Sequence, residues 1–272
     1  MDIISTHKNL RPKKSLGQNF LTSIPARNAI VTAGDLKKGQ KVLEIGPGKG
    51  MLTVGLLATG AHVVALEKDR ELVAFLKEKF VEEISSGQLT LIEGDALTFI
   101  PSDAGLERGE YKLIANIPYY ITGAILSRYL ESDTPPSDMV VLVQKEVATR
   151  VVARDGKHSL LSLSVQVYGT PKVVYKVSKG SFNPIPKVDS AVLSISNISH
   201  ANFSSPAHQK RFFELIHAGF AHKRKFLIRN LETIATPDVI RASFMQYSIP
   251  DKARSEDVTL TEWLLLSSIL EV

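Results

Sequence analysis

The chain has 272 residues, of which 44% are hydrophobic and 22% are charged, as in ordinary globular proteins. This composition excludes disordered, collagen-like and fibrous chains, and no apolar run reaches the ~18 residues that a membrane helix needs. The absence of cysteine excludes disulfide scaffolds, cysteine-bound metals and thiolate nucleophiles. The net charge of +5 permits an anionic partner without requiring one.

The N-terminal segment is basic and irregular, with Lys8, Arg11, Lys13 and Lys14 among its first residues. Neither an apolar core nor a small-residue cleavage site follows them, so we expect no leader peptide. Together with the absence of cysteine, this favours a cytoplasmic protein.

Apolar runs that alternate with helical segments begin near residue 24. Strands are expected at 41–45, 61–67, 89–93, 111–115 and 139–144, and helices at 24–33, 51–58 and 70–83. Such alternation predicts an α/β fold whose parallel sheet is covered by helices on both faces. Two further strands, at 173–177 and 188–195, end this block.

A polar stretch rich in Ser and Asn, at 197–208, separates this block from a helical C-terminal part. Helices are expected there at 209–232, 237–246 and 260–269, with no strand between them. The sequence therefore predicts two domains, an α/β domain of residues 1–200 and a helical domain of residues 201–272.

The residues EIGPGKG at 44–50 follow the first expected strand and open a helix. Glycines at such a position let the backbone turn sharply and approach a ligand. A phosphate-binding P-loop requires Ser or Thr after the lysine, but Gly50 follows Lys49. A dinucleotide fingerprint places its third glycine one residue later, where Met51 stands. The spacing E-x-G-x-G-x-G instead fits the loop of nucleoside-binding methyltransferases.

Two acidic residues lie at the ends of the second and third expected strands. Glu67 follows Gly46 by 67 − 46 = 21 residues, a spacing at which a carboxylate can bind both ribose hydroxyls of a nucleoside. Asp95, just after the third strand, could reach the adenine amino group. Alternatively, either carboxylate caps a helix or a turn, although their register with the glycine loop favours ligand binding.

The motif N-I-P-Y at 116–119 follows the fourth expected strand. An adenine amino group is a poor nucleophile because its lone pair is delocalised into the ring, but the Asn116 side chain and the Ile117 carbonyl can accept its two N–H bonds. Pro118 fixes the backbone, and Tyr119 offers a ring on which the base stacks. Such chemistry depends on positioning and needs no strong general base. The alternative is an ordinary turn with a core tyrosine.

Four separated motifs are KKSLGQNFL at 13–21, EIGPGKGMLT at 44–53, NIPYYIT at 116–122 and FNPIPKVDSAV at 182–192. With them, the chain resembles the rRNA adenine N6-dimethyltransferase family, and within it the branch that acts on small-subunit (16S) rRNA. A fifth motif, AGFAHKRKFLIRNL at 218–231, is similar to the basic helix of that family. The resemblance spans nearly the whole chain.

The resemblance implies a Rossmann-like methyltransferase sheet that uses S-adenosyl-L-methionine as its cofactor. The cofactor contacts are then expected from Gln18, Asn19, Leu21, Gly46, Glu67, Asp95, Ala96 and Asn116. The catalytic residues are expected to be Asn116, Ile117, Pro118, Tyr119 and Phe182. Phe182 would stack on the target base opposite Tyr119. The family dimethylates two adjacent adenosines in a hairpin loop near the 3′ end of 16S rRNA, which implies the small ribosomal subunit as partner.

Basic residues gather at two places that are candidates for rRNA binding. They are Arg11, Lys13 and Lys14, which the resemblance places beside the cofactor mouth, and Lys223, Arg224, Lys225 and Arg229, on an expected C-terminal helix. The second group replaces the usual Arg-Arg-Lys-Thr of the family with Lys-Arg-Lys-Phe, and lysine lacks the bidentate geometry of arginine toward phosphate. A solvated helix face is an equal alternative for this group.

Other functions stay open on the sequence. A related branch methylates one adenosine of large-subunit (23S) rRNA and confers macrolide resistance; it shares N-I-P-Y, whereas FNPIPKVDSAV and the basic C-terminal segment favour the small-subunit branch. A DNA adenine methylase is disfavoured because no target-recognition insertion is present. The intact Asn116, Tyr119 and Phe182 disfavour an assembly factor with little catalytic role. The histidines show no ligand spacing, so no catalytic metal is expected, and we expect a monomer that does not engage membranes.

Overall fold

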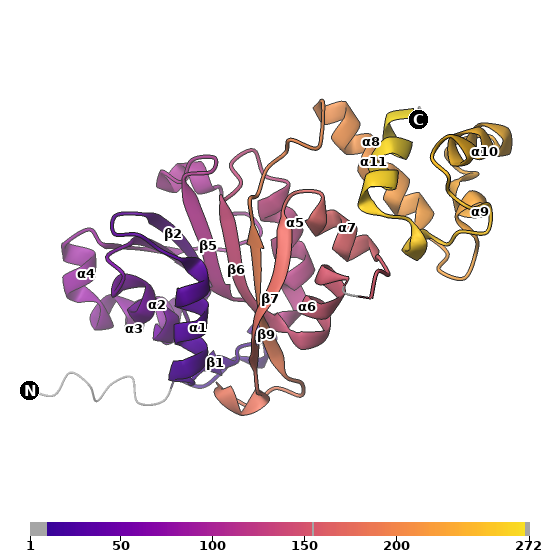
Figure 1. Cartoon of the computed structure of the whole chain (residues 1–272). Coiled ribbons are helices and arrows are strands. Elements are labelled where there is room, and N and C mark those ends of the chain that lie inside the picture. Colours follow the sequence, from indigo (N-terminus) through magenta and orange to yellow (C-terminus); the bar gives the residue numbers. More distant parts are fainter. Residues whose placement is uncertain (1–9, 154, 270–272) are drawn as a thin grey trace, which may run out of the picture. The chain divides into compact units, whose positions relative to one another are not determined.

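The computed structural model describes residues 10–153 and 155–269, so Lys8 lies outside the described residues. The chain forms two compact units, one of Met1–Ala148 with Thr170–Ile198 and one of Thr149–Gly169 with Ser199–Val272 (Figure 1). The expected boundary near residue 200 thus has a counterpart at 198. Residues 149–169, however, belong to the C-terminal unit, which the sequence analysis did not expect.

The side chain of Tyr168 explains why this internal segment joins the C-terminal unit. Its ring lies 5.7 Å from that of Phe203 and 6.1 Å from that of Phe213. Its hydroxyl accepts a 2.8 Å hydrogen bond from Gln209 Nε2. Burial of the Tyr168 ring against these aromatic side chains explains why residues 149–169 belong to the C-terminal unit, although the segments before and after them in the sequence belong to the first unit.

The first unit is built on a seven-stranded sheet with the order β4-β3-β2-β5-β6-β9-β7. Its strands are β2 (Lys41–Ile45), β3 (His62–Glu67), β4 (Leu89–Glu93), β5 (Tyr111–Asn116), β6 (Asp138–Gln144), β7 (Thr170–Val177) and β9 (Ser190–Ser196). The first five pair in parallel, and β9 pairs antiparallel with both β6 and β7. Nearly every residue of β2, β3 and β6 is buried, as expected for strands covered on both faces. The predicted α/β fold is confirmed.

The helices of the first unit are α1 (Ile24–Gly34), α2 (Met51–Leu57), α3 (Arg70–Lys79), α4 (Val81–Ser85) and α5 (Thr122–Leu130). Helix α6 (Lys145–Val152) follows β6. The expected helix 70–83 is interrupted at Phe80, whose φ of −116° and ψ of 37° are not helical. Its ring is buried against Gly50, where an added Cβ would lie 2.6 Å from it. Burial of this ring therefore takes precedence over helix continuity.

A two-stranded sheet joins the N-terminal segment to a later part of the same unit. It consists of β1 (Phe20–Leu21) and β8 (Phe182–Asn183), which pair antiparallel with Leu21 opposite Phe182. Helix α1 packs against β6, β7 and β9, and its residues Ala26 and Ile30 are buried.

The second unit is helical, with α7 (Leu160–Gln166), α8 (Pro206–Gly219), α9 (Leu227–Leu231), α10 (Pro237–Gln246) and α11 (Leu260–Ile269). The expected single helix 209–232 is wrong, because α8 ends at Gly219 and a turn separates it from α9. The buried ring of Trp263 packs at Gly219, where an added Cβ would lie 2.3 Å from it. Among the described helices, none combines the length and the apolar character that crossing a bilayer requires.

Candidate functional site

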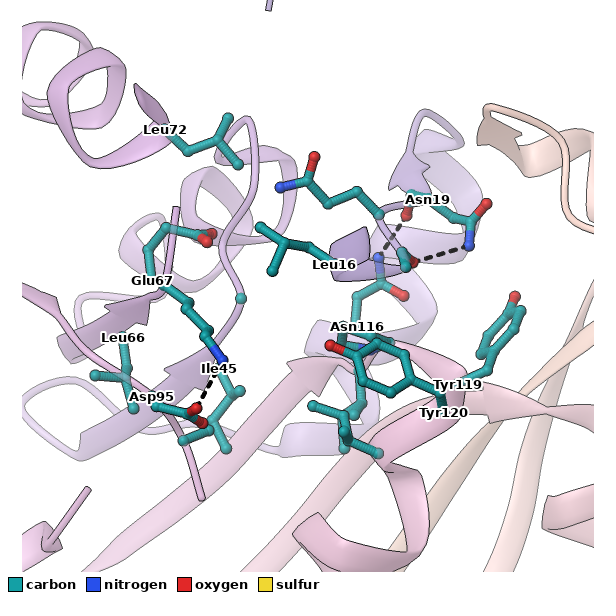
Figure 2. Close-up of a pocket in the computed structure, with 18 of the residues that line it drawn as sticks. Leu16, Asn19, Ile45, Leu66, Glu67, Leu72, Asp95, Asn116, Tyr119 and Tyr120 are labelled. Carbon is teal, nitrogen blue, oxygen red and sulfur yellow. Dashed lines mark hydrogen bonds and ion pairs between the residues drawn. The ribbon is translucent and has the colours of Figure 1, made fainter. Parts of the chain in front are cut away.

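A pocket opens at the carboxyl ends of β2, β3 and β5, beside β4. The order of the strands reverses between β2 and β5, and open α/β sheets bind ligands at such a switch point. The pocket encloses about 780 Å³ of non-atom space, part of which is open solvent. Figure 2 shows the labelled side chains around it, among them Glu67, Asp95, Asn116 and Tyr119.

The glycine loop between β2 and α2 borders this pocket, which Gly46 lines. Gly46, Gly48 and Gly50 have φ values of 66°, 58° and 75°, which are unfavourable for residues with a side chain. A Cβ at Gly48 would lie 3.0 Å from the ring of Phe20, whereas one at Gly46 would meet only a backbone oxygen at 3.9 Å. The backbone at Gly46 is therefore left open to a ligand.

Glu67, the last residue of β3, is held by the glycine loop and by the chain that follows it. Its Oε2 accepts a 3.1 Å hydrogen bond from the Gly48 N–H, and its Oε1 accepts a 2.9 Å bond from the Asp69 N–H. Burial raises the pKa of this carboxyl, and these hydrogen bonds oppose the rise. Each oxygen keeps a second lone pair, so the carboxylate can still accept two hydroxyl groups.

Asp95 lies on the same side of the pocket as Glu67, just after β4. Its Oδ2 forms a 2.8 Å ion pair with Lys68 Nζ, and its Oδ1 accepts a 2.9 Å bond from the Leu97 N–H (Figure 2). The hydrogen bond from Lys68 holds the pKa of this carboxyl below its ordinary value. Ala96 also lines the pocket and accepts a 3.1 Å bond from the Tyr129 hydroxyl through its carbonyl.

Asn116, at the end of β5, has an orientation that the structure defines. Its Nδ2 donates a 3.1 Å hydrogen bond to the Asn19 carbonyl (Figure 2). Because the amide nitrogen is committed to Asn19, the Oδ1 oxygen is the atom available to a ligand. Ile117 and Pro118 continue the pocket wall, and Pro118 has φ −56° and ψ 131°.

Two neighbouring tyrosines line the pocket next to Asn116. Tyr119 is half-buried, and its hydroxyl lies 2.6 Å from Ser190 Oγ. Tyr120 is 64% exposed and its ring packs on Gly17. The sequence analysis missed Tyr120, although the second tyrosine of N-I-P-Y-Y was a visible signal.

Phe182 does not line the pocket. Its side chain is 2% exposed in the hydrophobic core, and its strand pairs with β1. The sequence analysis expected Phe182 to lie opposite Tyr119 in the pocket. In the structure its ring is instead buried in the core.

The N-terminal residues Leu16 to Phe20 form one wall of the pocket, and Gln18 and Asn19 are part of it. Leu21 is buried and lines instead a small adjoining cavity, together with Gly46, Glu44 and Asn116. Both carboxylate oxygens of Glu44 are buried without a hydrogen-bond partner, and burial raises the pKa of this group to about 8. The sequence analysis assigned no part to this acid.

The two basic groups differ in what surrounds them. Arg11 and Lys14 are exposed, but Lys13 forms ion pairs of 2.7 Å with Asp69 Oδ1 and 3.1 Å with Glu71 Oε1. In the second unit, the exposed residues Lys223, Arg224 and Lys225 lie in the turn after α8. The expectation that they lie on a helix is wrong, because α8 ends at Gly219. Arg229 does lie on α9 and pairs with Glu232 at 2.7 Å.

No group of three or more His, Cys, Asp or Glu residues that could hold a metal ion occurs in the part of the chain that the structure describes.

A doubly wound sheet with a glycine loop, strand-end carboxylates and an Asn-Ile-Pro-Tyr segment defines a Rossmann-like methyltransferase. The sequence profile described as Ribosomal RNA adenine dimethylase matches residues 9–271. The chain belongs to this family of methyltransferases.

Relatives and solved structures agree with this membership. The chain is 40% identical over 260 residues to the Ribosomal RNA small subunit methyltransferase A of Dehalococcoides mccartyi, covering 94% of this chain and 88% of the relative. It is 36% identical over 268 residues to the protein of that name from Thermosynechococcus vestitus, covering 96% and 97%. The crystal structure of the 23S rRNA methyltransferase ErmE is 26% identical, with a TM-score of 0.73, and covers 93% of this chain and 99% of that one. A dimethyladenosine transferase from Plasmodium falciparum has the same fold, with a TM-score of 0.77 and 24% identity, covering 91% and 95%.

Proposed function

We propose that this protein uses S-adenosyl-L-methionine to dimethylate the N6 atoms of two adjacent adenosines in a hairpin loop near the 3′ end of 16S rRNA. The observation that carries this proposal is the orientation of Asn116. Its amide nitrogen is bound to the Asn19 carbonyl at 3.1 Å, so its Oδ1 is left to accept an N–H bond of the target amine. Curated relatives that are 36–40% identical and are named for the small ribosomal subunit support the choice of substrate.

The residues of the pocket fit the proposed cofactor. The Glu67 oxygens keep free lone pairs for the two ribose hydroxyls, and the backbone at Gly46 is open to the methionine part. Asp95, Ala96, Gln18 and Asn19 line the same pocket, and we assign Asp95 and Ala96 to the adenine ring. When bound, S-adenosyl-L-methionine supplies a methyl group that its sulfonium already activates.

The chain's own part in the reaction is to position the target amine. Asn116 Oδ1 and the Ile117 carbonyl accept its two N–H bonds, which directs the nitrogen lone pair toward the methyl group. The ring of Tyr119 supports the base. The acids that line the pocket among the described residues, Glu67 and Asp95, are bonded to backbone N–H groups and to Lys68. After methylation the nitrogen carries a positive charge and releases its proton to water, so no dedicated base is required.

The exposed basic residues would bind the phosphates of the rRNA. Of the two basic groups, the members that are exposed and for which the described residues give no ion pair are Arg11, Lys14, Lys223, Arg224 and Lys225. Replacing the three residues of the turn by glutamine should flatten the salt dependence of RNA binding by about 0.7–0.9 per lost contact. An unchanged slope would contradict this role.

The deciding experiment is transfer of tritium from labelled S-adenosyl-L-methionine to small and large ribosomal subunits that lack the modification. Label in two adjacent adenosines of the small subunit, with about four methyl groups per particle, is the expected result. Label in the large subunit alone would instead assign the 23S activity of the solved structure with 26% identity. Absence of label in both would contradict the proposal. We further expect a cytoplasmic monomer, which size-exclusion chromatography with light scattering would test for oligomeric state.

A further inference from the structure

The carboxylate of Asp69 connects the N-terminal wall of the pocket to the body of the sheet. Its Oδ1 accepts a 2.7 Å bond from Lys13 Nζ, and its Oδ2 accepts a 3.0 Å bond from Gln18 Nε2. Its Oδ1 also caps α3 by accepting a 3.1 Å bond from the Glu71 N–H. The Asp69 side chain is only 3% exposed, whereas that of Lys13 is 37% exposed, so the cation covers a buried carboxylate from the solvent side.

The same residue also holds Glu67. The backbone N–H of Asp69 donates a 2.9 Å bond to Glu67 Oε1, the carboxylate proposed to bind the ribose. Asp69 therefore both fixes the Glu67 carboxylate and holds the N-terminal wall of the pocket. A ligand at Glu67 and the position of that wall are thus linked through Asp69, by its N–H bond to Glu67 and by the bonds that its carboxylate accepts from Lys13 and Gln18.

Residues 13–18 form a short strap with two attachments. The first and last residues of the strap, Lys13 and Gln18, both bind Asp69, and the Lys13 N–H donates a 2.7 Å bond to Gln18 Oε1, which joins the two ends. After Gln18 the chain continues into β1, which pairs with β8, and the Asn19 carbonyl accepts the bond from Asn116. Leu16, Gly17 and Gln18 of the strap line the pocket directly.

The charges of the first attachment stabilise each other. Burial alone would raise the pKa of Asp69, but the hydrogen bonds from Lys13 and Gln18 outweigh it and lower the pKa. The hydrogen bond to Asp69 correspondingly raises the pKa of Lys13. Both groups are thus ionised at neutral pH, and opening the strap would leave a buried carboxylate without its cation.

We infer that Asp69 is the anchor, and Lys13 the ionic latch, that keep residues 13–18 closed over the bound cofactor. Lys13 then acts in cofactor retention, whereas Lys14, which is exposed, remains available to RNA. This inference rests on the proposed use of S-adenosyl-L-methionine. Asp69 is a positioning residue, because it acts on the cofactor through the strap and through Glu67.

The test uses the full chain without RNA and S-adenosylhomocysteine as the ligand. Lys13→Met and Asp69→Asn should each weaken its binding in calorimetry by about tenfold, the scale of one charge-assisted hydrogen bond, mainly through faster dissociation. Asparagine caps helices as well as aspartate does, so Asp69→Asn tests the latch rather than α3. Lys14→Met is the matched control, since it removes the same charge one residue away and should leave this affinity unchanged.

Two further measurements separate a latch from a general loss of structure. Lys13→Met with Asp69→Asn together should weaken binding by clearly less than the product of the two single effects, because both variants lose the shared Lys13–Asp69 bond. Ligand-dependent protection of the amides of residues 13–18 against hydrogen exchange should be lost in both single variants and kept in Lys14→Met.

The outcomes distinguish the two levels of the argument. If the wild-type chain does not bind S-adenosylhomocysteine, the proposed cofactor is wrong, and the inference of a latch is wrong as well. If the wild type binds but Lys13→Met binds equally well and instead flattens the salt dependence of RNA binding, the latch is wrong and Lys13 is an RNA contact. The latch would also be contradicted if the single variants unfold at temperatures more than a few degrees below that of the wild type but keep the ligand-dependent protection of residues 13–18 against hydrogen exchange.

Discussion

The two sides of the pocket use different chemistry. At the ends of β3 and β4, Glu67 and Asp95 present carboxylates whose oxygens are already fixed by backbone N–H groups and by Lys68. At the end of β5, Asn116 and Tyr119 present a neutral amide and a ring, held by the Asn19 carbonyl and by Ser190. Charge thus lies where a nucleoside would be recognised, and neutral acceptors lie where the amine would react.

This difference has a physical reason. A carboxylate that accepts two hydroxyl groups gives strong, directional binding, and its desolvation is compensated by the N–H groups around it. Beside the target amine, a neutral acceptor can orient N–H bonds without adding a further buried charge. Substitutions on the two sides should therefore separate binding from turnover.

The largest effect is expected from Asn116→Ala. Loss of the Oδ1 acceptor should lower the rate of methyl transfer by about 10²–10³, the scale for one preorganised hydrogen-bonding group at a reacting centre. Binding of S-adenosylhomocysteine should change by only a few fold. Single-turnover transfer and calorimetry measure the two quantities. A large loss of cofactor affinity with unchanged transfer at saturation would reverse the roles assigned to the two sides. The variant should still bind small subunits, which keeps any assembly role testable.

Glu67→Gln should lower the affinity for the cofactor rather than the rate of methyl transfer. The amide nitrogen would replace one of the two oxygens, so it would face the N–H of either Gly48 or Asp69 without accepting from it, and it could not accept from a ribose hydroxyl. Cofactor affinity should therefore fall by about 10–100-fold. The rate at saturating cofactor should fall much less. Steady-state kinetics would show this as a rise in KM. An equal fall in kcat would mean that Glu67 also serves the chemical step.

The pH dependence of binding should follow from the same carboxylate. Because burial raises the pKa of Glu67 above its ordinary value of 4.5, its protonated form becomes populated at higher pH than that of an exposed glutamate. Affinity for S-adenosylhomocysteine should therefore be complete near neutral pH and fall on acidification through this raised pKa. Asp95, whose pKa is lowered, should stay ionised over that interval. Glu67→Gln should flatten the profile; a profile unchanged in this variant would exclude Glu67 as its source.

Asp95→Asn should have a smaller effect, a loss of about three- to tenfold in cofactor affinity. Its side chain is 34% exposed and shares its charge with Lys68, so solvent already screens the interaction. Lys68→Met is the matched control, since it breaks the same ion pair from the other side. If the control weakens binding as strongly as Asp95→Asn, the ion pair rather than a contact from Asp95 to the adenine matters.

The smallest effect is expected from Tyr119→Phe. This change keeps the ring and removes only the 2.6 Å bond to Ser190, so the free energy of unfolding should fall by about 1 kcal/mol. Methyl transfer should fall less than about threefold, whereas Tyr119→Ala should lose the stacking surface and affect transfer much more. Thermal unfolding and single-turnover transfer distinguish the two variants. Equal losses in both would place the function in the hydroxyl.

Local patterns in the sequence determined much of this protein. Apolar runs between helical segments predicted β2 to β6, because periodicity and turn residues act within a few positions of the chain. The E-x-G-x-G-x-G spacing, Glu67, Asp95 and Asn116 could be predicted to meet, since the carboxyl ends of parallel strands share one edge of the sheet. The family followed from the same motifs, and the sequence comparison confirmed it.

The tertiary structure decided what depends on residues far apart in sequence. Lys13 reaches Asp69 across 56 positions, which no local pattern reports. The turn that carries Lys223 to Lys225 exists because the ring of Trp263 packs at Gly219, and helix propensity does not register such a contact. Burial likewise placed Phe182 in the core and residues 149–169 in the C-terminal unit. Local sequence patterns predict secondary-structure elements and site residues. Packing between residues distant in sequence determines where helices end and which charged side chains remain without an ion pair.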